Sequence, residues 1–339
     1  MVKVAINGFG RIGRLFFRQA FGNKNINVVA INDLGSIENL AYLLKHDSVY
    51  GSFDKSVKVE GSNLIVGGKR VECLQIKEPG KLPWRKLGID IVVESTGVFD
   101  SFAASKDHLR AGVKRVVITA PADDADGKEG ATVLLGINED KLGSVKLSSN
   151  ASCTTNAASP VIAIISEKLG IEKAMLSTVH GYTATQSLVD GPVRGHDLRR
   201  GRAAAFNIVP STTGAAKAIE KAIPELTGKF DGIALRVPVI AGSIADITLV
   251  TKRDTSVKEV NAILKSAAAS SRWKGIMTVT EDPVVSSDIV GRPYGAIVDL
   301  PLTRVVGGNL VKILSWYDNE YGYASTLIKH VERAAKHLK

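Results

Sequence analysis

The chain has 339 residues, of which 45% are hydrophobic and 23% are charged, and its formal net charge is +10. This length allows two domains with cores of their own, and the apolar runs fall well short of the roughly 18 residues that a membrane-spanning helix needs. Lysine and arginine are scattered rather than grouped in blocks, so we expect the positive charge to serve anionic small molecules and not a dedicated nucleic-acid partner.

The N-terminal segment has the pattern of a dinucleotide-binding unit. Residues 2–6 predict a buried parallel strand, and Gly8, Gly10 and Gly13 follow it before a helical segment. In this pattern the first glycine permits a tight turn, the second lets the backbone approach a pyrophosphate, and the third lets helix and strand pack closely. Because the strand pattern starts at Val2, we also expect no signal peptide and a cytoplasmic location.

Asp33 completes the dinucleotide pattern. It follows a second predicted strand, residues 27–32, about 20 residues after the last glycine, where a carboxylate binds the ribose hydroxyls. Strand, glycines, helix, strand and acid in this order are far more specific than a glycine pattern alone. A carboxylate here repels a 2′-phosphate, which favours NAD over NADP. The alternative is that Asp33 serves only the turn at Leu34-Gly35.

The rest of the first half alternates between strands and helices. The pattern predicts helices over 36–46 and 101–111, a small antiparallel meander over 57–71, and strands over 89–94, 115–119 and 131–135. Loops at the carboxyl ends of such strands line the ligand crevice of doubly wound sheets. The acidic segment 123–130 lacks the carboxylate spacing of a calcium loop, so it predicts an exposed loop.

Cys153 follows the polar run 148–152 and precedes an apolar segment at helical spacing. We predict a loop leading into a helix over 153–169, with Ser152 as its cap. A helix N-terminus lowers the pKa of a thiol, and a histidine nearby in the fold would complete the shift. The alternative is a small buried hydrophobic residue. With Cys73 as the other cysteine, neither a disulfide framework nor a metal site is expected.

The second half has a different pattern. A strand over 174–179 ends at His180, and a long polar loop, 181–207, follows. A loop of this length in a compact domain is usually functional. A helix over 213–221, strands over 233–240 and 244–252, and a last helix over 318–337 complete the prediction, with the strands forming an antiparallel sheet. Five other histidines lie in predicted helices or loops, where surface roles are expected: His46, His108, His196, His330 and His337.

A thiolate beside a nicotinamide suits aldehyde oxidation. The sulfur forms a thiohemiacetal, whose oxidation leaves a thioester for water or phosphate to release. His180 is the best candidate base, because it stands at a strand end soon after the cysteine helix. Arg236 lies in an apolar strand, where its charge requires an anion or a structural ion pair. Thr213-Gly214, at a helix start, has the pattern of an anion site.

Five motifs carry a family resemblance over essentially the whole chain. They are Asn7-Gly8-Phe9-Gly10-Arg11-Ile12-Gly13-Arg14, Glu94-Ser95-Thr96-Gly97, Ser149-Asn150-Ala151-Ser152-Cys153-Thr154-Thr155-Asn156, Thr213-Gly214-Ala215-Ala216-Lys217 and Trp316-Tyr317-Asp318-Asn319-Glu320-Tyr321-Gly322-Tyr323. In these motifs the chain resembles the phosphorylating glyceraldehyde-3-phosphate dehydrogenases of glycolysis. The resemblance implies the oxidation of D-glyceraldehyde 3-phosphate to 1,3-bisphosphoglycerate with NAD and inorganic phosphate.

The resemblance also implies a role for each matching residue. Cys153 would be the nucleophile and His180 the base. The inorganic-phosphate site would comprise Ser152, Thr154, Thr213, Gly214 and Arg236, and the substrate-phosphate site Thr183, Thr185, Arg200 and Arg236, with Arg199 an alternative to Arg200. The cofactor contacts would be Gly8, Gly10, Arg11, Ile12, Gly13, Asp33, Lys77, Thr119, Asn319 and Tyr323. Lys77 and Thr119 stand where arginine and serine are common in the family.

The implied architecture is α/β. A Rossmann-type, doubly wound parallel sheet over 1–152, completed by the C-terminal helix 318–339, would bind NAD, and 153–317 would form an α+β catalytic domain with a mostly antiparallel sheet. The family assembles as a homotetramer in which the 181–207 loop lies against a neighbour's cofactor. Two alternatives stay open: an erythrose-4-phosphate dehydrogenase, which releases its thioester to water, and a non-catalytic NAD- or RNA-binding protein on the same frame.

Overall fold

The computed structural model describes residues 1–193 and 196–338. The described chain divides into two units. The first comprises Met1–Val133, Asn138–Ala151 and Ala324–Lys339, and the second comprises Leu134–Ile137 and Ser152–Tyr323. The C-terminal helix thus joins the first unit from Ala324, whereas the prediction assigned the whole of 318–339 to that domain. Position 339 of that prediction lies outside the described residues.

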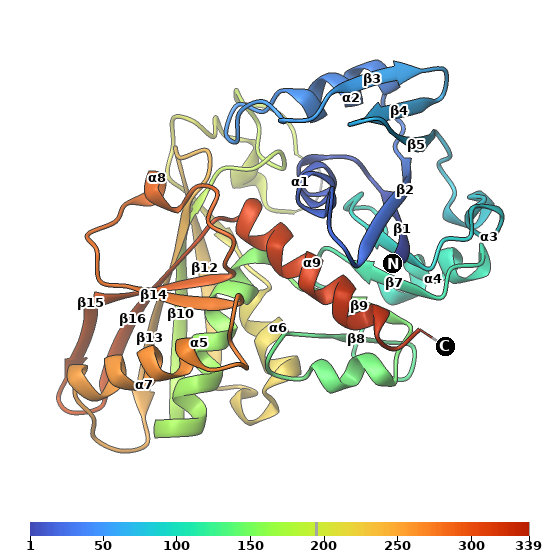
Figure 1. Cartoon of the computed structure of the whole chain (residues 1–339). Helices are drawn as coiled ribbons and strands as arrows, with labels where there is room; N and C mark the ends of the chain where they lie inside the picture. The colour runs from blue at the N-terminus through green and yellow to red at the C-terminus, as the bar shows by residue number, and fades with distance from the viewer. Residues whose placement is uncertain (194–195, 339) are drawn as a thin grey trace. The chain divides into compact units, whose positions relative to one another are not determined.

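The first unit contains a mainly parallel sheet, of nine strands within the described residues (Figure 1). Its strands pair in parallel, except that β4 is antiparallel to both of its neighbours. In spatial order they are β3 (Val57–Glu60), β4 (Asn63–Val66), β5 (Lys69–Leu74), β2 (Ile26–Asn32), β1 (Val2–Asn7), β6 (Ile91–Glu94), β7 (Arg115–Ile118), β9 (Leu147–Ser149) and β8 (Gly130–Thr132).

Apolar side chains cover both faces of this sheet. Val4 and Ile6 of β1 belong to one buried cluster and Ala5, between them, to the other, because successive residues of a strand point to opposite faces. The helices of this unit are α1 (Arg11–Ala20), α2 (Ile37–Lys45), α3 (Trp84–Leu87), α4 (Phe102–Arg110) and most of α9 (Tyr321–Ala335). Short 3₁₀ helices span Pro79–Lys81 and Glu139–Gly143.

The second unit contains a mixed, mostly antiparallel sheet, of seven strands among the described residues. Only the pairs β10 with β12 and β14 with β15 are parallel among its pairings. In spatial order the strands are β11 (Val209–Thr212), β12 (Phe230–Val237), β10 (Ile171–Gly181), β13 (Ser243–Thr251), β16 (Leu310–Tyr317), β15 (Ala296–Val306) and β14 (Met277–Thr280).

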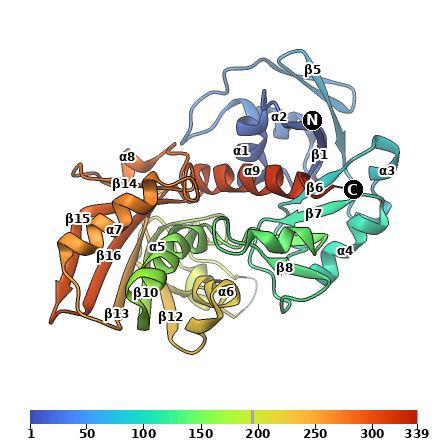
Figure 2. The same cartoon turned by 60° about the horizontal axis from the view of Figure 1, so that its bottom comes forward.

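Helices cover one face of this second sheet. Helix α5 (Cys153–Leu169) packs on β13, β15 and β16, and α7 (Val257–Ala269) packs on β14 and β15 (Figures 1 and 2). Helix α5 is buried over most of its length, as its apolar sequence requires. The remaining helices are α6 (Ala215–Ala222) and α8 (Ser286–Ile289), with 3₁₀ helices at Leu198–Gly201 and Pro224–Leu226.

The fold class is confirmed, and several local predictions need correction. His108 and His330, for which surface roles were expected, are fully buried. The predicted strand 131–135 ends at Thr132. Ser148 and Ser149 belong to β9 instead of the loop before Cys153, because β9 pairs with β7. The strand predicted over 233–240 ends at Val237, and it does not pair with the strand predicted over 244–252, because β10 lies between them and pairs with both. The last helix begins at Tyr321 and not at 318, since Asp318 accepts hydrogen bonds from the backbone of residues 320 and 321.

No helix among residues 1–193 and 196–338 is long and apolar enough to span a membrane.

Candidate active site

Cys153 is the first residue of α5, directly after the N-cap Ser152. The Ser152 hydroxyl accepts the Thr155 N–H at 3.0 Å, which satisfies one of the unpaired donors of the helix N-terminus. The residue before the cap, Ala151, is buried and has a left-handed backbone with φ of 53°. Such a conformation is costly for a residue with a side chain. The tight turn from β9 therefore delivers the sulfur to the start of the helix.

The nucleophile candidate and the base candidate lie together. Sγ of Cys153 is 3.4 Å from Nε2 of His180, a buried residue near the end of β10. Arg236 of β12 is the register partner of His180 in the parallel β10–β12 pair, and its Nη1 lies 2.7 Å from His180 Nδ1. Thiol, imidazole and guanidinium thus form one contiguous cluster, although β10 and α5 are joined through Gly170 and Arg236 comes from a later strand.

Each tautomer of His180 has a partner. With its hydrogen on Nδ1 the ring donates to the Gly181 carbonyl, at 2.6 Å, and leaves Nε2 to accept the thiol proton. With its hydrogen on Nε2 the ring accepts from Arg236 at Nδ1 and donates toward the sulfur. The proton can therefore reside at either nitrogen without leaving a buried group unpaired.

Burial dominates the protonation of this cluster. It lowers the pKa of His180 to about 3, with the Arg236 charge acting in the same direction, so the imidazole is neutral at physiological pH. Burial also raises the pKa of Cys153, against the opposing effects of Arg236 and Thr154. The sequence predicted a lowered pKa for this thiol. The predicted direction is wrong for this chain, because burial destabilises the thiolate by more than Arg236 and Thr154 stabilise it.

Arg236 has an unused donor. Its Nε is buried and has no hydrogen-bond partner within the described residues, while Nη1 faces His180 and the Gly181 carbonyl. An orphaned guanidinium N–H in a polar cluster is the donor that an anion would satisfy. The alternative of a structural ion pair does not fit, since no carboxylate forms a salt bridge with Arg236 in the described chain.

The 181–207 loop brings three predicted substrate-phosphate residues together. The hydroxyls of Thr183 and Thr185 are 2.9 Å apart, and Arg200 Nη1 lies 3.4 Å from the Thr185 hydroxyl. Arg199 is exposed, so the geometry favours Arg200 as the loop arginine. Residues 194 and 195 of the predicted loop lie outside the described residues.

Two residues that the sequence analysis missed orient Arg200. Its Nε donates to the Ser211 hydroxyl at 3.0 Å and to Asp197 Oδ2 at 3.2 Å. The hydrogen bond from Ser211, together with the Arg200 charge, lowers the pKa of Asp197. No local pattern marks either residue, because Ser211 lies on β11 and Asp197 lies in the loop.

Tyr317 was also missed, although it stands in the quoted motif at the end of β16. Its hydroxyl is 2.8 Å from Thr154 Oγ1 and 2.7 Å from Thr178 Oγ1, and its ring packs edge-on against His180. The Thr154 hydroxyl is therefore part of a buried chain, and both this hydroxyl and the Thr154 backbone N–H also act on the Cys153 sulfur. Burial raises the pKa of Tyr317, which keeps this phenol protonated.

The other predicted inorganic-phosphate residues, Thr213 and Gly214, lie at the start of α6. Thr213 accepts the Ala215 N–H, and Gly214 is the N-cap of α6 with open space beside its Cα. Within the described residues no hydrogen bond joins either of them to Cys153, His180 or Arg236. Their assignment to the same anion stays a prediction.

In the first unit, the glycine loop is shaped as a dinucleotide site requires. A Cβ on Gly8 would lie 2.5 Å from the Thr96 nitrogen, and one on Gly13 would lie 2.2 Å from the Gly8 carbonyl oxygen, so neither position tolerates a side chain. Gly10 has nothing within 4 Å, and α1, which starts after it, has no side-chain cap. An open approach to an uncapped helix N-terminus fits a pyrophosphate.

Asp33 connects the loop to the end of β2. Its Oδ2 accepts the Phe9 N–H at 2.6 Å and its Oδ1 accepts the Gly35 N–H at 2.9 Å, so it serves the turn and also holds the glycine loop. A carboxylate has about four acceptor positions, which leaves room for ribose hydroxyls. The residues of this chain therefore fit a dinucleotide.

The remaining predicted cofactor residues have these positions. Arg11 pairs with Asp47 at 2.7 Å, Ile12 packs against the core, Lys77 is exposed, and the Thr119 N–H donates to the Glu94 carbonyl. In the second unit, the amide oxygen of Asn319 accepts from Gly242 N–H and the Ser243 hydroxyl, and Tyr323 is buried. The roles of these residues stay predictions.

Comparisons with known proteins agree with this geometry. A family model described as the glyceraldehyde 3-phosphate dehydrogenase NAD-binding domain matches residues 2–102, and one described as the C-terminal domain of the same enzyme matches 152–319. The chain belongs to the glyceraldehyde-3-phosphate dehydrogenase family. Its cofactor is NAD, as predicted, and its chemistry is that of an oxidoreductase.

Relatives match over nearly the whole chain. Glyceraldehyde-3-phosphate dehydrogenases of Mycobacterium avium and Mycolicibacterium smegmatis are 48% and 47% identical, and each match covers 99% of this chain and 99% of the relative. The enzyme of Borreliella burgdorferi is 46% identical, over 99% of this chain and 100% of its own length. The two domain models and these full-length matches confirm the resemblance found in the sequence motifs.

Proposed function

We propose that this chain oxidises D-glyceraldehyde 3-phosphate to 1,3-bisphosphoglycerate, with NAD and inorganic phosphate, through a thioester on Cys153. The observation that carries the proposal is the 3.4 Å contact between Cys153 Sγ and His180 Nε2, with the Arg236 guanidinium against the far side of the imidazole. The contact supports the proposal because a thiol, an imidazole and a guanidinium, which suit a nucleophile, a base and an anion-binding group, lie together within a family-matched domain.

The first step is sulfur attack on the aldehyde carbon. As the C–S bond forms, the thiol proton moves to Nε2 of the neutral His180, and the carbonyl oxygen becomes an alkoxide that the imidazolium N–H stabilises or protonates. The raised pKa of Cys153 means that the proton leaves during the attack rather than beforehand. The His180 pKa of about 3 makes the charged imidazole a strong acid, ready to return its proton.

The second step leaves a thioester on Cys153. When bound, NAD supplies the acceptor for the hydride of the aldehyde carbon. His180 accepts the hydroxyl proton as the carbon–oxygen double bond forms, and its Nδ1–H, which donates to the Gly181 carbonyl, holds the ring in place.

In the third step a phosphate oxygen attacks the thioester carbonyl, the C–S bond breaks, and the sulfur regains a proton through His180. The unpartnered Nε of Arg236 supports phosphate as the acceptor, because a buried guanidinium without a carboxylate partner binds an anion more strongly than it binds neutral water. Arg200, Thr183 and Thr185 would bind the phosphate that the substrate already carries.

The test is NADH formation from glyceraldehyde 3-phosphate and NAD, with and without inorganic phosphate. We expect turnover to depend strongly on phosphate and the product to be an acyl phosphate, trapped as a hydroxamate. Turnover that is indifferent to phosphate would replace this proposal with hydrolysis, as in an erythrose-4-phosphate dehydrogenase. Absence of turnover together with intact NAD binding would favour the non-catalytic alternative.

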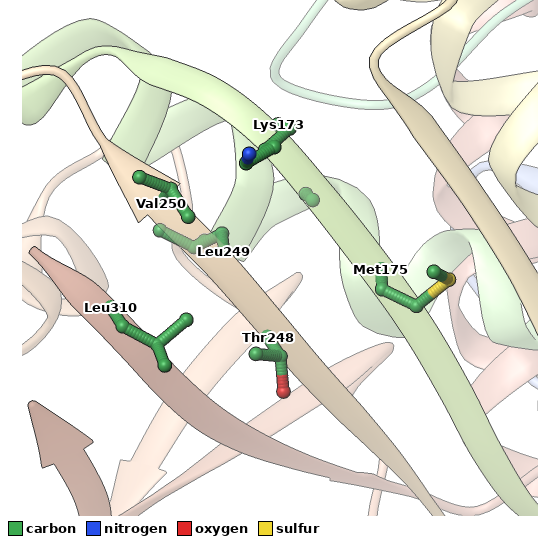
Figure 3. Close-up of a pocket in the computed structure, with 7 residues that line it drawn as sticks. Lys173, Met175, Thr248, Leu249, Val250 and Leu310 are labelled. Atoms are coloured by element: carbon green, nitrogen blue, oxygen red, sulfur yellow. The ribbon is translucent and has the colours of Figure 1, made fainter. Parts of the chain in front are cut away.

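We also propose that the chain assembles as a homotetramer. The face of the second sheet that α5 does not cover carries a pocket of about 220 Å³ along β10, β13 and β16, with Met175, Thr248 and Leu310 around it (Figure 3). Met175 is 58% exposed there, and Phe206 in the 181–207 loop is 87% exposed. Apolar side chains gathered on a sheet face and a long loop are typical of subunit interfaces.

Sedimentation velocity tests the assembly. We expect a species of four chains at micromolar concentration, and a shift toward smaller species for the double variant Met175→Ser, Phe206→Ser. A wild-type chain that sediments as a monomer would contradict the proposal.

We also propose that the protein is located in the cytoplasm. The two free cysteines among the described residues support this location, because they suit a reducing compartment. Cell fractionation tests it.

A further inference from the structure

A buried chain of hydrogen bonds in the first unit begins at Trp84. Its indole N–H donates to His108 Nδ1 at 3.0 Å, and His108 Nε2 lies 3.0 Å from Glu94 Oε2. These three residues are at most 2% exposed. Because an indole N–H can only donate, Nδ1 accepts, and the imidazole hydrogen therefore sits on Nε2 and points at the Glu94 carboxylate.

Glu94 also forms hydrogen bonds with two neighbouring segments. Its Oε2 also accepts the Asn7 amide at 2.5 Å, while its Oε1 accepts both the N–H and the hydroxyl of Thr96, at 2.9 and 2.5 Å. A buried carboxylate that accepts four hydrogen bonds has its acceptor positions filled and is held rigidly. If the histidine is removed, the carboxylate loses one of these donors and is no longer held in the same orientation.

The chain continues from Asn7 to Asn32. The Asn32 amide nitrogen donates to Asn7 Oδ1 at 2.7 Å and to the Ile76 carbonyl at 2.9 Å, and its oxygen accepts the Ile76 N–H at 2.9 Å. The network therefore joins the carboxyl ends of β1, β2 and β6 with the segment after β5.

Four members of this network stand next to residues of the predicted dinucleotide site or of the loop that packs against it. Asn7 precedes Gly8, Asn32 precedes Asp33, and Ile76 precedes Lys77. Glu94 precedes Ser95, whose hydroxyl donates to the Gly8 carbonyl at 2.6 Å. We propose that His108 is a positioning residue for NAD: held by Trp84, it fixes Glu94, and through Glu94 and the two asparagines it sets the relative positions of the segments that bind the cofactor.

The inference deepens the proposed function, on which it rests in taking NAD as the ligand. His108 does not touch the cofactor site itself, so its effect is on affinity. Misplacing three binding segments weakens the contacts that depend on all of them, whereas the thiol chemistry in the second unit has its own supporting residues. Removing His108 should therefore raise the Kd and KM for NAD more than it lowers kcat at saturating NAD.

The main test is His108→Leu, with NAD binding measured by calorimetry on the intact protein and folding measured by thermal unfolding. We expect the Kd for NAD to rise about tenfold. His108→Gln, whose amide offers one acceptor and one donor, should recover most of this loss. Wild-type NAD binding and turnover are measured in parallel, so that failure of the proposed function is distinguished from failure of the positioning role.

The matched control is His330→Leu. His330 is likewise fully buried in the first unit, where it bonds to Ser148 and Asn150 instead of the network. It should lose comparable thermal stability but keep its Kd for NAD within about twofold. Equal changes in Kd for the two Leu variants, or an unchanged Kd for a folded His108→Leu, would overturn the proposal. If that variant does not fold, Trp84→Phe decides: a threefold or larger rise in Kd supports the role, and an unchanged Kd refutes it.

Discussion

At the scale of single residues, Cys153 and His180 show how little of a site's chemistry depends on one helix terminus. The cysteine stands at the start of α5 as predicted, yet burial raises its pKa and lowers that of His180. Both groups are therefore neutral in the free protein, and in the proposed mechanism the proton is transferred at the moment of attack. In that mechanism the imidazole 3.4 Å away is what makes the sulfur reactive.

Replacing the nucleophile separates binding from chemistry. Cys153→Ser should keep the Kd for NAD close to that of the wild type and reduce turnover by at least about a thousandfold, because a serine hydroxyl is a far weaker nucleophile beside this base. Cys73→Ser is the control, since Cys73 lies on β5 and burial raises its thiol pKa to about 11. The measurement is NADH formation, and near-normal activity of Cys153→Ser would refute the covalent mechanism.

We expect two functions of Asp33, and one substitution removes both with a different measurable effect for each. Asp33→Ala removes the acceptor of the Phe9 and Gly35 N–H groups, so the Kd for NAD should rise. It also removes the charge that repels a 2′-phosphate, so the ratio of NADP to NAD efficiency should rise by about tenfold. Steady-state kinetics with both cofactors measure the ratio. An unchanged ratio would mean that selectivity comes from another residue.

At the scale of secondary-structure elements, the β1–α1 turn combines two kinds of glycine. Gly8 is enclosed by the backbone of Ser95 and Thr96, and Gly13 by the Gly8 carbonyl, whereas Gly10 faces open space and has an ordinary negative φ of −69°. The first two are therefore required by the fold, and we expect Gly10 to be required by what binds there. The distinction could not be made from the sequence, in which all three fit the same pattern.

This difference predicts opposite outcomes for two alanine variants. Gly10→Ala should fold with a Tm within about 2 °C of the wild type, but raise the Kd for NAD by about tenfold, because its methyl group occupies the approach of the pyrophosphate. Gly127→Ala, at another glycine with nothing within 4 Å, should change neither quantity. Thermal unfolding measures the Tm, and calorimetry measures the Kd for NAD. Unaltered NAD affinity in Gly10→Ala would contradict the assigned approach.

At the scale of the whole molecule, buried histidines make the stability of both units depend on pH. The pKa values of His180 and His330 are lowered to about 3 by burial, from an ordinary value near 6.5. Between these values the unfolded chain binds more protons than the folded one. The stability that the neutral histidines contribute is thus fully present above pH 6.5 and is lost as the pH falls toward 3.

The pH dependence has a direct test in His330→Gln. The wild-type free energy of unfolding should fall as the pH decreases from 6.5, and each such histidine contributes a slope of up to about 1.4 kcal/mol per pH unit. The variant lacks one titrating group, so its slope should be smaller by up to that amount, even if its stability at pH 7.5 is lower. Urea unfolding at several pH values measures this. Equal slopes would show that acid unfolding starts elsewhere.

Much of the fold could be predicted because its signals are local. The glycine turn, the carboxylate after β2 and the capped start of α5 each depend on a few adjacent residues, and the structure has the corresponding elements within a few positions of the prediction. The elements α7, β14 and β15, which lie within 257–269 and 277–306, are not among those predicted from the sequence, and neither is the neighbouring β16. Their positions in the sheet depend on partners far along the chain.

The sequence by itself therefore determined the family, the fold class and NAD, and it supplied the candidates for chemical roles, because adjacent side chains carry these signals. Only the tertiary structure decided that Arg236 meets His180 through the β10–β12 register, that Asp197 and Ser211 orient Arg200, and that Tyr317 supports Thr154. It also reversed the expected direction of the thiol pKa. Pairings between distant strands and the burial of charge arise from packing in three dimensions, which no short stretch of sequence encodes.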